Sequence, residues 1–498
     1  MPPAVTLRSV TSNVGWSVLS KTSTFGLKFV TVPILARLLS PEEFGIVAVA
    51  LTVVLFVTMV GGAGLAAALV VERDEDEITI HTVFWANLGV ACLLAAALFF
   101  AAAPIAAAMG APAGTIVLKV LALIVPLQLA GDVAYALLAR RMAFDRDAFW
   151  SVIAESAAAL SAVALALAGW GLWALVAQVI VSAGIRLVGL LVATGYRPRL
   201  AFSFRRLRRL LRFSVALMGS EVFNFITFQS PLVIVSRLLG ITEAGAYSAA
   251  NRFSSIPNQV VLAALMGVLF PTFSHIADDA KRRARALMLA TRTCTVLLAP
   301  MMFGIWAVAE PGMLVIFGEQ WAWAWPVLGL LAVSKGIMSP CSTYIPYLKG
   351  VGRGDVLWWV AVARAALVSA AVTLGALSGG LVGAMVWLCL ANAVTLVFYC
   401  HVVFRTDGMP FLKSFLITCR PMIAAFLMAL AVRLLVGHLE AGGAPALWQV
   451  VGGAIAGASL YALMILATEY RLMREVTGLL AKAWARPAPQ EAAGRRAS

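Results

Sequence analysis

The sequence is short of charged residues, and of acidic ones in particular. Asp, Glu, Lys and Arg together make up 12% of its 498 residues, whereas a typical soluble domain has about 25%. So little charge excludes a conventional soluble protein. The 38 basic residues outnumber the 23 acidic ones, but the sequence has no soluble basic domain with aromatic or groove-reading elements. We therefore expect no nucleic-acid partner.

The sequence also lacks the patterns of a metal, redox or catalytic centre. Its six cysteines form no C-x-x-C pair, and its four histidines lie at the ends of apolar segments without a cysteine or carboxylate pattern beside them. We predict cysteines that serve packing, no metal, no cofactor and no catalytic residue. The first residues show no basic segment followed by a short apolar run and a cleavage site, so we expect no removable signal peptide.

Long apolar runs are abundant, because hydrophobic residues make up 62% of the chain. A run of about twenty such residues crosses a bilayer core of about 30 Å as a helix. The polar residues between the runs delimit about fourteen of these helices. They lie near residues 14–36, 44–71, 81–104, 115–138, 148–169, 171–194, 210–236, 244–272, 287–310, 322–348, 356–378, 380–403, 415–437 and 446–468. The sequence predicts an all-α polytopic membrane protein.

An internal repeat divides these helices into two halves. Ala36–Gly45 reads ARLLSPEEFG, and Ser236–Gly245 reads SRLLGITEAG at an offset of 200 residues without a gap. Six helices per half bring both copies into the membrane from the same side. We predict two pseudo-symmetric six-helix lobes around a central cavity, formed by residues 1–200 and 201–406. Two additional transmembrane helices follow in 407–468, and 469–498 is expected to form a cytoplasmic amphipathic helix, or a solvated stretch, and a tail.

Arginine and lysine are distributed unevenly between the two sides of the predicted bundle. The connection from Tyr196 to Arg212 alone holds seven arginines, and the 281–285 loop on the same side adds four basic residues. Connections on the opposite side carry few basic residues. Because cytoplasmic loops hold the Lys and Arg excess, both termini are predicted to be cytoplasmic.

The first predicted helix carries a polar stripe. Asn13, Ser17, Lys21, Thr24, Lys28 and Thr31 follow one another in steps of three or four residues, which places them on one helical face. Lys21 and Lys28 are about 10.5 Å apart along the axis. A seam of interhelical hydrogen bonds suits serine and threonine, but lysines inside a membrane are costly and favour a water-filled cavity. We therefore favour a cavity lined by this stripe.

The second half supplies polar groups at the matching places. The offset pairs Lys21 with Glu221, which Asn224 follows one turn later, and we predict that Lys21 and Glu221 pair across the two halves. Asn251 and Arg252 stand shortly before Pro257, a residue that kinks helices. Arg186 also lies within an apolar run, and its position near a helix end favours a side chain that snorkels to the membrane surface.

The segment Pro33–Gly45, PILARLLSPEEFG, resembles the polysaccharide transporters of the multidrug/oligosaccharidyl-lipid/polysaccharide flippase superfamily, the Wzx type. The resemblance covers nearly the whole chain. It implies a bacterial inner-membrane flippase that moves an undecaprenyl-diphosphate-linked oligosaccharide of an exopolysaccharide, capsule or O-antigen to the periplasmic leaflet by alternating access. Membrane lipids, a polysaccharide polymerase and export machinery are the implied partners.

Related flippases hold the diphosphate with cationic side chains in the cavity. The resemblance assigns this role to Lys21, Lys28 and Arg252, with Thr24, Glu221, Asn224 and Asn251 as further substrate-binding candidates. The sequence departs from a symmetric pattern, because Thr52, the repeat partner of Arg252, is uncharged.

Two alternatives remain. A multidrug or cation exporter of the same superfamily is expected to carry a carboxylate in the first helix, where this chain has Lys21 and Lys28. A membrane polysaccharide polymerase or glycosyltransferase normally has a sizeable periplasmic loop, and the predicted outer connections are short. We therefore predict a transporter and no enzyme.

Overall fold

The computed structural model describes residues 23–24, 26–62, 69, 77–275 and 279–468, and for 209–220 and 263–275 it describes the backbone alone. Within this part of the chain every regular element is a helix. Nine of the described helices are long and apolar enough to span a membrane, and the pair Glu319–Ile337 and Ser339–Gly350, bent by 55°, is a tenth candidate. The all-α polytopic prediction is confirmed. The count of fourteen helices stays a prediction, as does the tail at 469–498, which lies outside the described residues.

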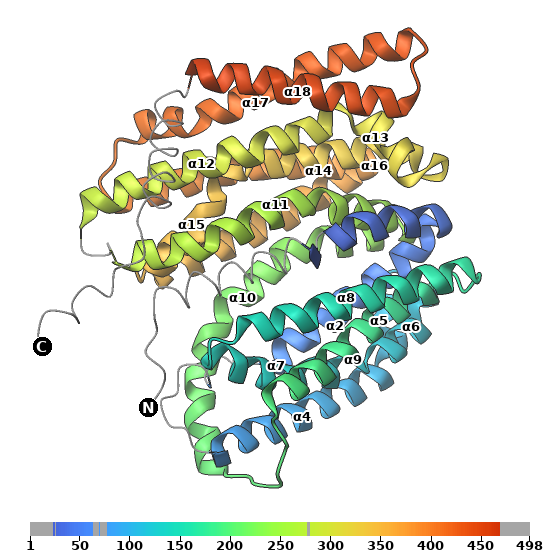
Figure 1. The fold of residues 1–498 in the computed structure, drawn as a ribbon, viewed down its shortest axis with the longest axis vertical. Coiled ribbons are helices and arrows are strands. Elements are labelled where there is room, and N and C mark those ends of the chain that lie inside the picture. Colours follow the sequence, from blue (N-terminus) through green and yellow to red (C-terminus); the bar gives the residue numbers. More distant parts are fainter. Residues whose placement is uncertain (1–22, 25, 63–68, 70–76, 276–278, 469–498) are drawn as a thin grey trace, which may run out of the picture.

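A first bundle is formed by the helices that precede residue 195 (Figure 1). It consists of a helix over residues 26–38, α2 (Pro41–Gly62), α4 (Glu77–Phe100), α5 (Ala102–Ala108), η1 (Pro112–Gly114), α6 (Thr115–Leu121), α7 (Ile124–Arg140), α8 (Phe144–Leu167) and α9 (Trp173–Thr194). The strongest packing joins α8 to α9, α9 to α7 and α7 to α4. Alanines at every fourth position of α8, from Ala154 to Ala166, are buried, so small side chains allow this close packing.

A second bundle follows. It consists of α10 (Phe204–Leu238), α11 (Ile241–His275), α12 (Ala280–Ala307), α13 (Ala309–Phe317), η2 (Glu319–Ala324), α14 (Trp325–Ile337), η3 (Ser339–Thr343), α15 (Tyr344–Gly350) and α16 (Gly354–Thr406). The 53 residues of α16 double back at Gly379 and Gly380, where the backbone leaves helical geometry and Gly380 has a φ of +59°. Gly375 then faces Gly383, whose carbonyl oxygen lies 2.5 Å from where a Cβ of Gly375 would be. The predicted helix boundary between 378 and 380 therefore corresponds to a helical hairpin.

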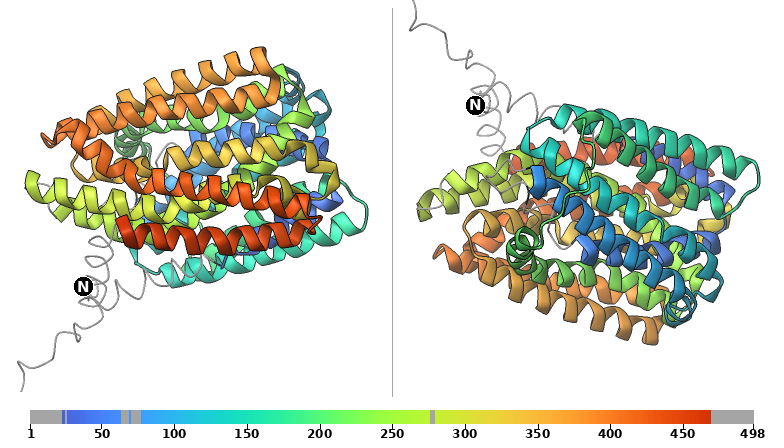
Figure 2. Two further views of the ribbon diagram at one scale, coloured as in Figure 1. Left: turned by 90° about the horizontal axis from the view of Figure 1, so that it is seen from above. Right: turned by 90° about the horizontal axis from the view of Figure 1, so that it is seen from below.

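Two last helices, α17 (Phe411–Ala441) and α18 (Ala446–Thr468), pack on the outside of the second bundle. α17 lies against α12, and α18 lies against α17 and α13. Figure 2 shows most of the long helices running nearly parallel or antiparallel, as spans of one membrane do, whereas the first part of α10 runs across them. The predicted order of two lobes followed by two additional helices agrees with this arrangement, whereas the domain boundaries stay predictions.

The connection between the bundles is docked on the N-terminal end of α4. The Trp85 indole donates a hydrogen bond to the Arg199 carbonyl oxygen at 2.8 Å, and the Ser203 backbone N–H donates to the Thr82 hydroxyl at 3.0 Å. The Tyr196 hydroxyl lies 2.8 Å from His81 Nδ1, and burial raises the pKa of Tyr196 to about 12. The arginine-rich connection therefore has a defined position on the first bundle.

The repeat seen in the sequence has a direct structural counterpart. The 26–38 helix ends at Leu38 and α2 starts at Pro41, while α10 ends at Leu238 and α11 starts at Ile241, so the breaks fall 200 residues apart. In the first copy Ser40 and Glu43 form a capping box, with the Ser40 N–H donating to Glu43 Oε2 at 2.8 Å.

The two bundles meet where these repeats start, along α2 and α11. Gly45 and Gly245, which correspond in the repeat, allow the backbones to touch. A Cβ on Gly45 would lie 2.0 Å from the Ile241 carbonyl oxygen, and a Cβ on Gly245 would lie 1.7 Å from the Pro41 carbonyl oxygen. Neighbouring apolar side chains continue the contact, because Phe44 packs edge-on against the buried Trp321. The bundles are therefore closed against each other at this end.

Side chains of the second bundle reinforce this closure. The Trp321 indole and the Gln320 amide both donate to the Ala36 carbonyl oxygen at 2.7 Å. At the repeat-related position, the Ser236 hydroxyl donates to the Met109 carbonyl oxygen of the first bundle at 2.7 Å. Each bundle thus hydrogen-bonds the residue that lies just before the other bundle's helix break.

Candidate functional site: a charged cavity between the bundles

A cavity of about 620 Å³ lies among the 26–38 helix, α2, α7, α8, α9 and α11. A second cavity of about 470 Å³ adjoins it, because the two share Lys28, Tyr135, Glu155, Ser182 and Arg186. Most of the lining belongs to the first bundle, and α11 closes it from the second. The pair forms one space in which charged and neutral polar side chains lie among apolar ones.

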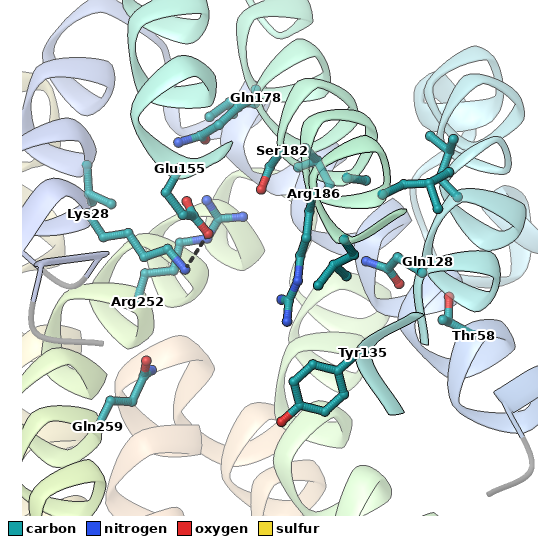
Figure 3. A pocket seen from close by; sticks show the side chains of 18 of the residues that line it. Lys28, Thr58, Gln128, Tyr135, Glu155, Gln178, Ser182, Arg186, Arg252 and Gln259 are labelled. Atoms are coloured by element: carbon teal, nitrogen blue, oxygen red, sulfur yellow. Dashed lines mark ion pairs between the residues drawn. The ribbon is translucent and has the colours of Figure 1, made fainter. Parts of the chain in front are cut away.

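Lys28 and Glu155 form the central ion pair of this space (Figure 3). The Lys28 ammonium lies 3.2 Å from Glu155 Oε1, and the two side chains are 45% and 24% exposed. Lys28 projects from the face of the 26–38 helix predicted to be polar, and Glu155 lies halfway along α8. A lysine within a membrane helix requires water or a counter-charge, and Glu155 supplies the counter-charge here.

Arg186 forms a second charged group on the opposite wall. Its guanidinium lies 3.5 Å from Asp147 of α8 and 6.0 Å from the centre of the Tyr135 ring. Asp132 of α7 lines the same cavity. The predicted snorkelling of Arg186 is wrong: the side chain is directed into the cavity, because carboxylates there compensate its charge at a lower cost than a path through lipid.

Arg252 enters the cavity from α11. Figure 3 shows its guanidinium beside Lys28 and Glu155. Among the residues that the structure describes, no carboxylate lies within ion-pairing distance of Arg252, in contrast to Lys28 and Arg186. Arg252 is therefore a cation held in a polar cavity without a bound counter-ion from the described chain.

The charges of the whole space are balanced when every group is ionised. Three cations, Lys28, Arg186 and Arg252, stand against three carboxylates, Asp132, Asp147 and Glu155. Within the described residues no group of three His, Cys, Asp or Glu side chains could hold a metal ion. The cavity can therefore exchange ion pairs and hydrogen bonds with a polar ligand.

The other predicted site residues have different positions. Thr24 lines the second cavity, whereas Asn224 and Asn251 line neither of the two. Glu221 is exposed on α10, and its carboxylate lies 3.5 Å from the Lys349 ammonium. Lys21 lies outside the described residues, so its pairing with Glu221 stays a prediction.

Sequence reasoning missed most of the cavity's neutral polar groups. Gln128, Gln178, Ser182 and Gln259 all line the first cavity. Gln178 and Ser182 are one turn apart on α9, and Arg186 follows one turn later, which makes a polar stripe like that of the first helix. This periodicity is the signal that could have identified them.

Two helical bundles around a charged cavity define a two-lobed membrane transporter fold. The lipid II flippase MurJ, in an inward closed conformation, shares it with a TM-score of 0.73 at 14% identity over 92% of this chain and 99% of that chain. An inward-facing multidrug resistance transporter of the MATE family shares it with a TM-score of 0.56 at 13% identity over 82% of this chain and 96% of that chain. At such identities the likeness concerns the fold alone.

The sequence comparisons are more specific. Residues 34–326 match the family described as polysaccharide biosynthesis protein. The chain is 59% identical to the succinoglycan biosynthesis transport protein ExoT of Rhizobium meliloti, over 99% of this chain and all of that protein. It is 24% identical to the lipopolysaccharide biosynthesis protein WzxC of Escherichia coli, over 77% of this chain and 78% of that protein. The chain belongs to this polysaccharide biosynthesis family, and the resemblance to Wzx-type transporters is confirmed.

Proposed function

We propose that this protein is a flippase that moves an undecaprenyl-diphosphate-linked oligosaccharide across the bacterial inner membrane, with both termini in the cytoplasm. The relationship to a succinoglycan biosynthesis transport protein supports an exopolysaccharide repeat unit as the cargo. The arginine-rich connection then lies on the cytoplasmic side, and the Gly45–Gly245 contact closes the periplasmic side. In this state the cavity receives the cargo from the cytoplasmic leaflet.

The observation that carries this proposal is Arg252 in the cavity beside Lys28. A guanidinium without a carboxylate partner from the described chain is ready to bind phosphate oxygens, and its fork geometry suits them. In a partly hydrated cavity of low dielectric, such a pair is much stronger than in water. The diphosphate is the anionic part of the cargo, so we place it between Lys28 and Arg252.

Glu155 then competes with the cargo for Lys28. The 3.2 Å ion pair with Glu155 compensates the charge of Lys28 when the cavity is empty. A diphosphate that replaces Glu155 as the partner keeps this charge compensated throughout the transport cycle. Sugar hydroxyls would bind the neutral groups of the cavity wall, such as Gln178 and Ser182. The polyprenyl chain stays in lipid, with α17 and α18 forming one wall of its path.

The test is binding of undecaprenyl diphosphate and of neutral undecaprenol to the purified protein in nanodiscs, with export measured in cells that lack the native gene. We expect diphosphate-dependent binding that falls in Lys28→Gln and Arg252→Gln, with export lost at normal protein levels. Exposed Lys413, at the start of α17, supplies the control variant Lys413→Gln. Equal binding of the two lipids, or native export by both cavity variants, would contradict the proposal.

A cation exporter is the second candidate, because the cavity holds Asp132, Asp147 and Glu155 and an aromatic wall at Tyr135. Organic cations would bind these carboxylates, and the likeness to a MATE fold agrees with that chemistry. Drug susceptibility of cells with and without the gene separates the two functions. Unchanged susceptibility together with lost polysaccharide supports the flippase. A polymerase or glycosyltransferase has the least support, since a relative named for transport matches 99% of this chain.

A further inference from the structure

A half-buried lysine of the second bundle lies against α11 at the turn that carries Arg252. Lys335 lies on α14, and its ammonium donates hydrogen bonds to the Asn251 carbonyl oxygen at 3.1 Å and to the hydroxyls of Ser254 and Ser255 at 2.7 Å each. All three ammonium hydrogens thus have an acceptor. No carboxylate of the described chain pairs with Lys335.

The acceptors are oriented towards this cation. The Ser254 hydroxyl donates to the Ala250 carbonyl oxygen at 2.8 Å, and the Ser255 hydroxyl donates to the Asn251 carbonyl oxygen at 2.6 Å. Because each hydroxyl hydrogen is engaged with the backbone, the oxygen lone pairs are left for the ammonium. This arrangement is a three-oxygen cation site that a side chain of the same protein fills.

The turn of α11 that Lys335 contacts lacks one of its helical hydrogen bonds. Pro257 follows two residues after Ser255 and has no N–H, so one helical hydrogen bond of this turn is missing. Lys335 comes from a helix that is itself fixed, because the Asn392 amide of α16 donates to the neighbouring Ser334 hydroxyl at 2.6 Å. The ammonium therefore connects the interrupted turn of α11 to the body of the second bundle.

We propose that Lys335 is a positioning residue that supplies a built-in cation to this three-oxygen site and thereby fixes Arg252 in the cavity. The contact to the Asn251 carbonyl oxygen acts on the peptide unit that leads into Arg252, so it sets the direction of the guanidinium. Without the Lys335 ammonium, this turn of α11 is less restrained. The Arg252 guanidinium then has no fixed position at which to bind an anionic headgroup. This proposal rests on the proposed function for the identity of that headgroup, whereas the cation site itself does not.

Chemical rescue tests the cation site. Lys335→Ala removes all of the side chain beyond Cβ, and the vacancy has the shape of n-propylammonium. We expect a lower Tm for the full-length protein in nanodiscs, raised again by n-propylammonium chloride in a concentration-dependent way and not by 1-propanol, because ligands that bind the native state stabilise it by mass action. Lys335→Met fills the vacancy with an apolar chain and should show no rescue. Absence of a propylammonium effect specific to Lys335→Ala would overturn the cation site.

Binding of undecaprenyl diphosphate tests the positioning role. We expect Lys335→Ala to bind roughly tenfold or more weakly, since small displacements of a binding group are costly, and n-propylammonium to restore binding. Native binding by Lys335→Ala, or rescue of Tm without rescue of binding, would overturn the role. If the wild-type protein itself does not bind undecaprenyl diphosphate, both the proposed function and the positioning role are wrong. The rescue of Tm by n-propylammonium remains an independent test of the cation site.

Discussion

Replacement of Gly245 by alanine should open the end of the molecule at which the two bundles meet. The new Cβ would lie 1.7 Å from the Pro41 carbonyl oxygen and 3.0 Å from the Gly45 nitrogen. Both are backbone atoms, so no side chain can turn away to make room. The helices α2 and α11 must therefore separate by more than about 1 Å, in an interior that is close-packed.

The size of the effect follows from the cost of overpacking. An extra methyl group in a well-packed contact costs about 1–3 kcal/mol, and a rigid backbone contact belongs at the upper end of this range. Because the cost applies only to the closed state, it shifts the equilibrium towards the open state by a factor of up to about 150. Turnover should fall, since a transporter that rests in one state rarely completes its cycle.

Hydrogen exchange followed by mass spectrometry measures this opening without added labels. Amides at the start of α2 and α11 should exchange faster in Gly245→Ala than in the native protein. Gly304→Ala is the matched control, because Gly304 lies within α12 and has nothing within 4 Å of its Cβ position. Gly45→Ala should act in the same way, and the double variant should show less than the sum, since both changes open one contact. Unchanged exchange and transport in Gly245→Ala would refute the reasoning.

Two further predictions concern the proposed topology and an ion pair of the second bundle. A cysteine that replaces Ser203, in the arginine-rich connection, should escape a membrane-impermeant reagent in intact cells, whereas one that replaces Ser40 should react once the closed end opens; the reverse pattern would show that the topology is inverted. Asp407→Asn should lower the free energy of unfolding by about 1.5–3 kcal/mol, because half-buried Arg283 loses the carboxylate at 2.9 Å and the hydrogen bond from Tyr347 is weakened. A Tm within 1 °C or so of the native value would contradict this expectation.

The helices could be predicted from the sequence because each needs only a local signal. Apolar runs located the spans, and the break at Leu38–Pro41 and its copy at Leu238–Ile241 follow from a gapless repeat. The repeat also aligns Gly45 with Gly245, the two glycines that are in contact in the structure. Their contact was not predicted, since an offset in the sequence does not show which faces of two helices touch.

The ion pairs could not be predicted from the sequence for the same reason. Lys28 was predicted as a cavity residue from its own helix, but its partner Glu155 lies on α8, and the rotation of α8 about its axis has no strong sequence signal. The site of Lys335 could not be predicted either, because its acceptors are a backbone carbonyl and two serine hydroxyls. Neutral acceptors leave no pattern that distinguishes them from ordinary helix residues.

Lys28 and Arg186 of the first bundle are compensated differently from Lys335 and Arg364 of the second, and the difference bears on how the cavity accepts an anion. In the first bundle Lys28 and Arg186 face carboxylates, whereas in the second Lys335 is held by neutral oxygens and Arg364 lies 5.3 Å from the centre of the Phe228 ring. Neutral partners orient a cation but leave its charge uncancelled, so Lys335 and Arg364 add positive potential to the second bundle. An anionic headgroup gains from this potential before it displaces any carboxylate. Under the proposed function, attraction by these cations and competition with Glu155 would act on the same ligand in opposite directions. Such a balance would make binding strong enough to admit the cargo and weak enough to release it.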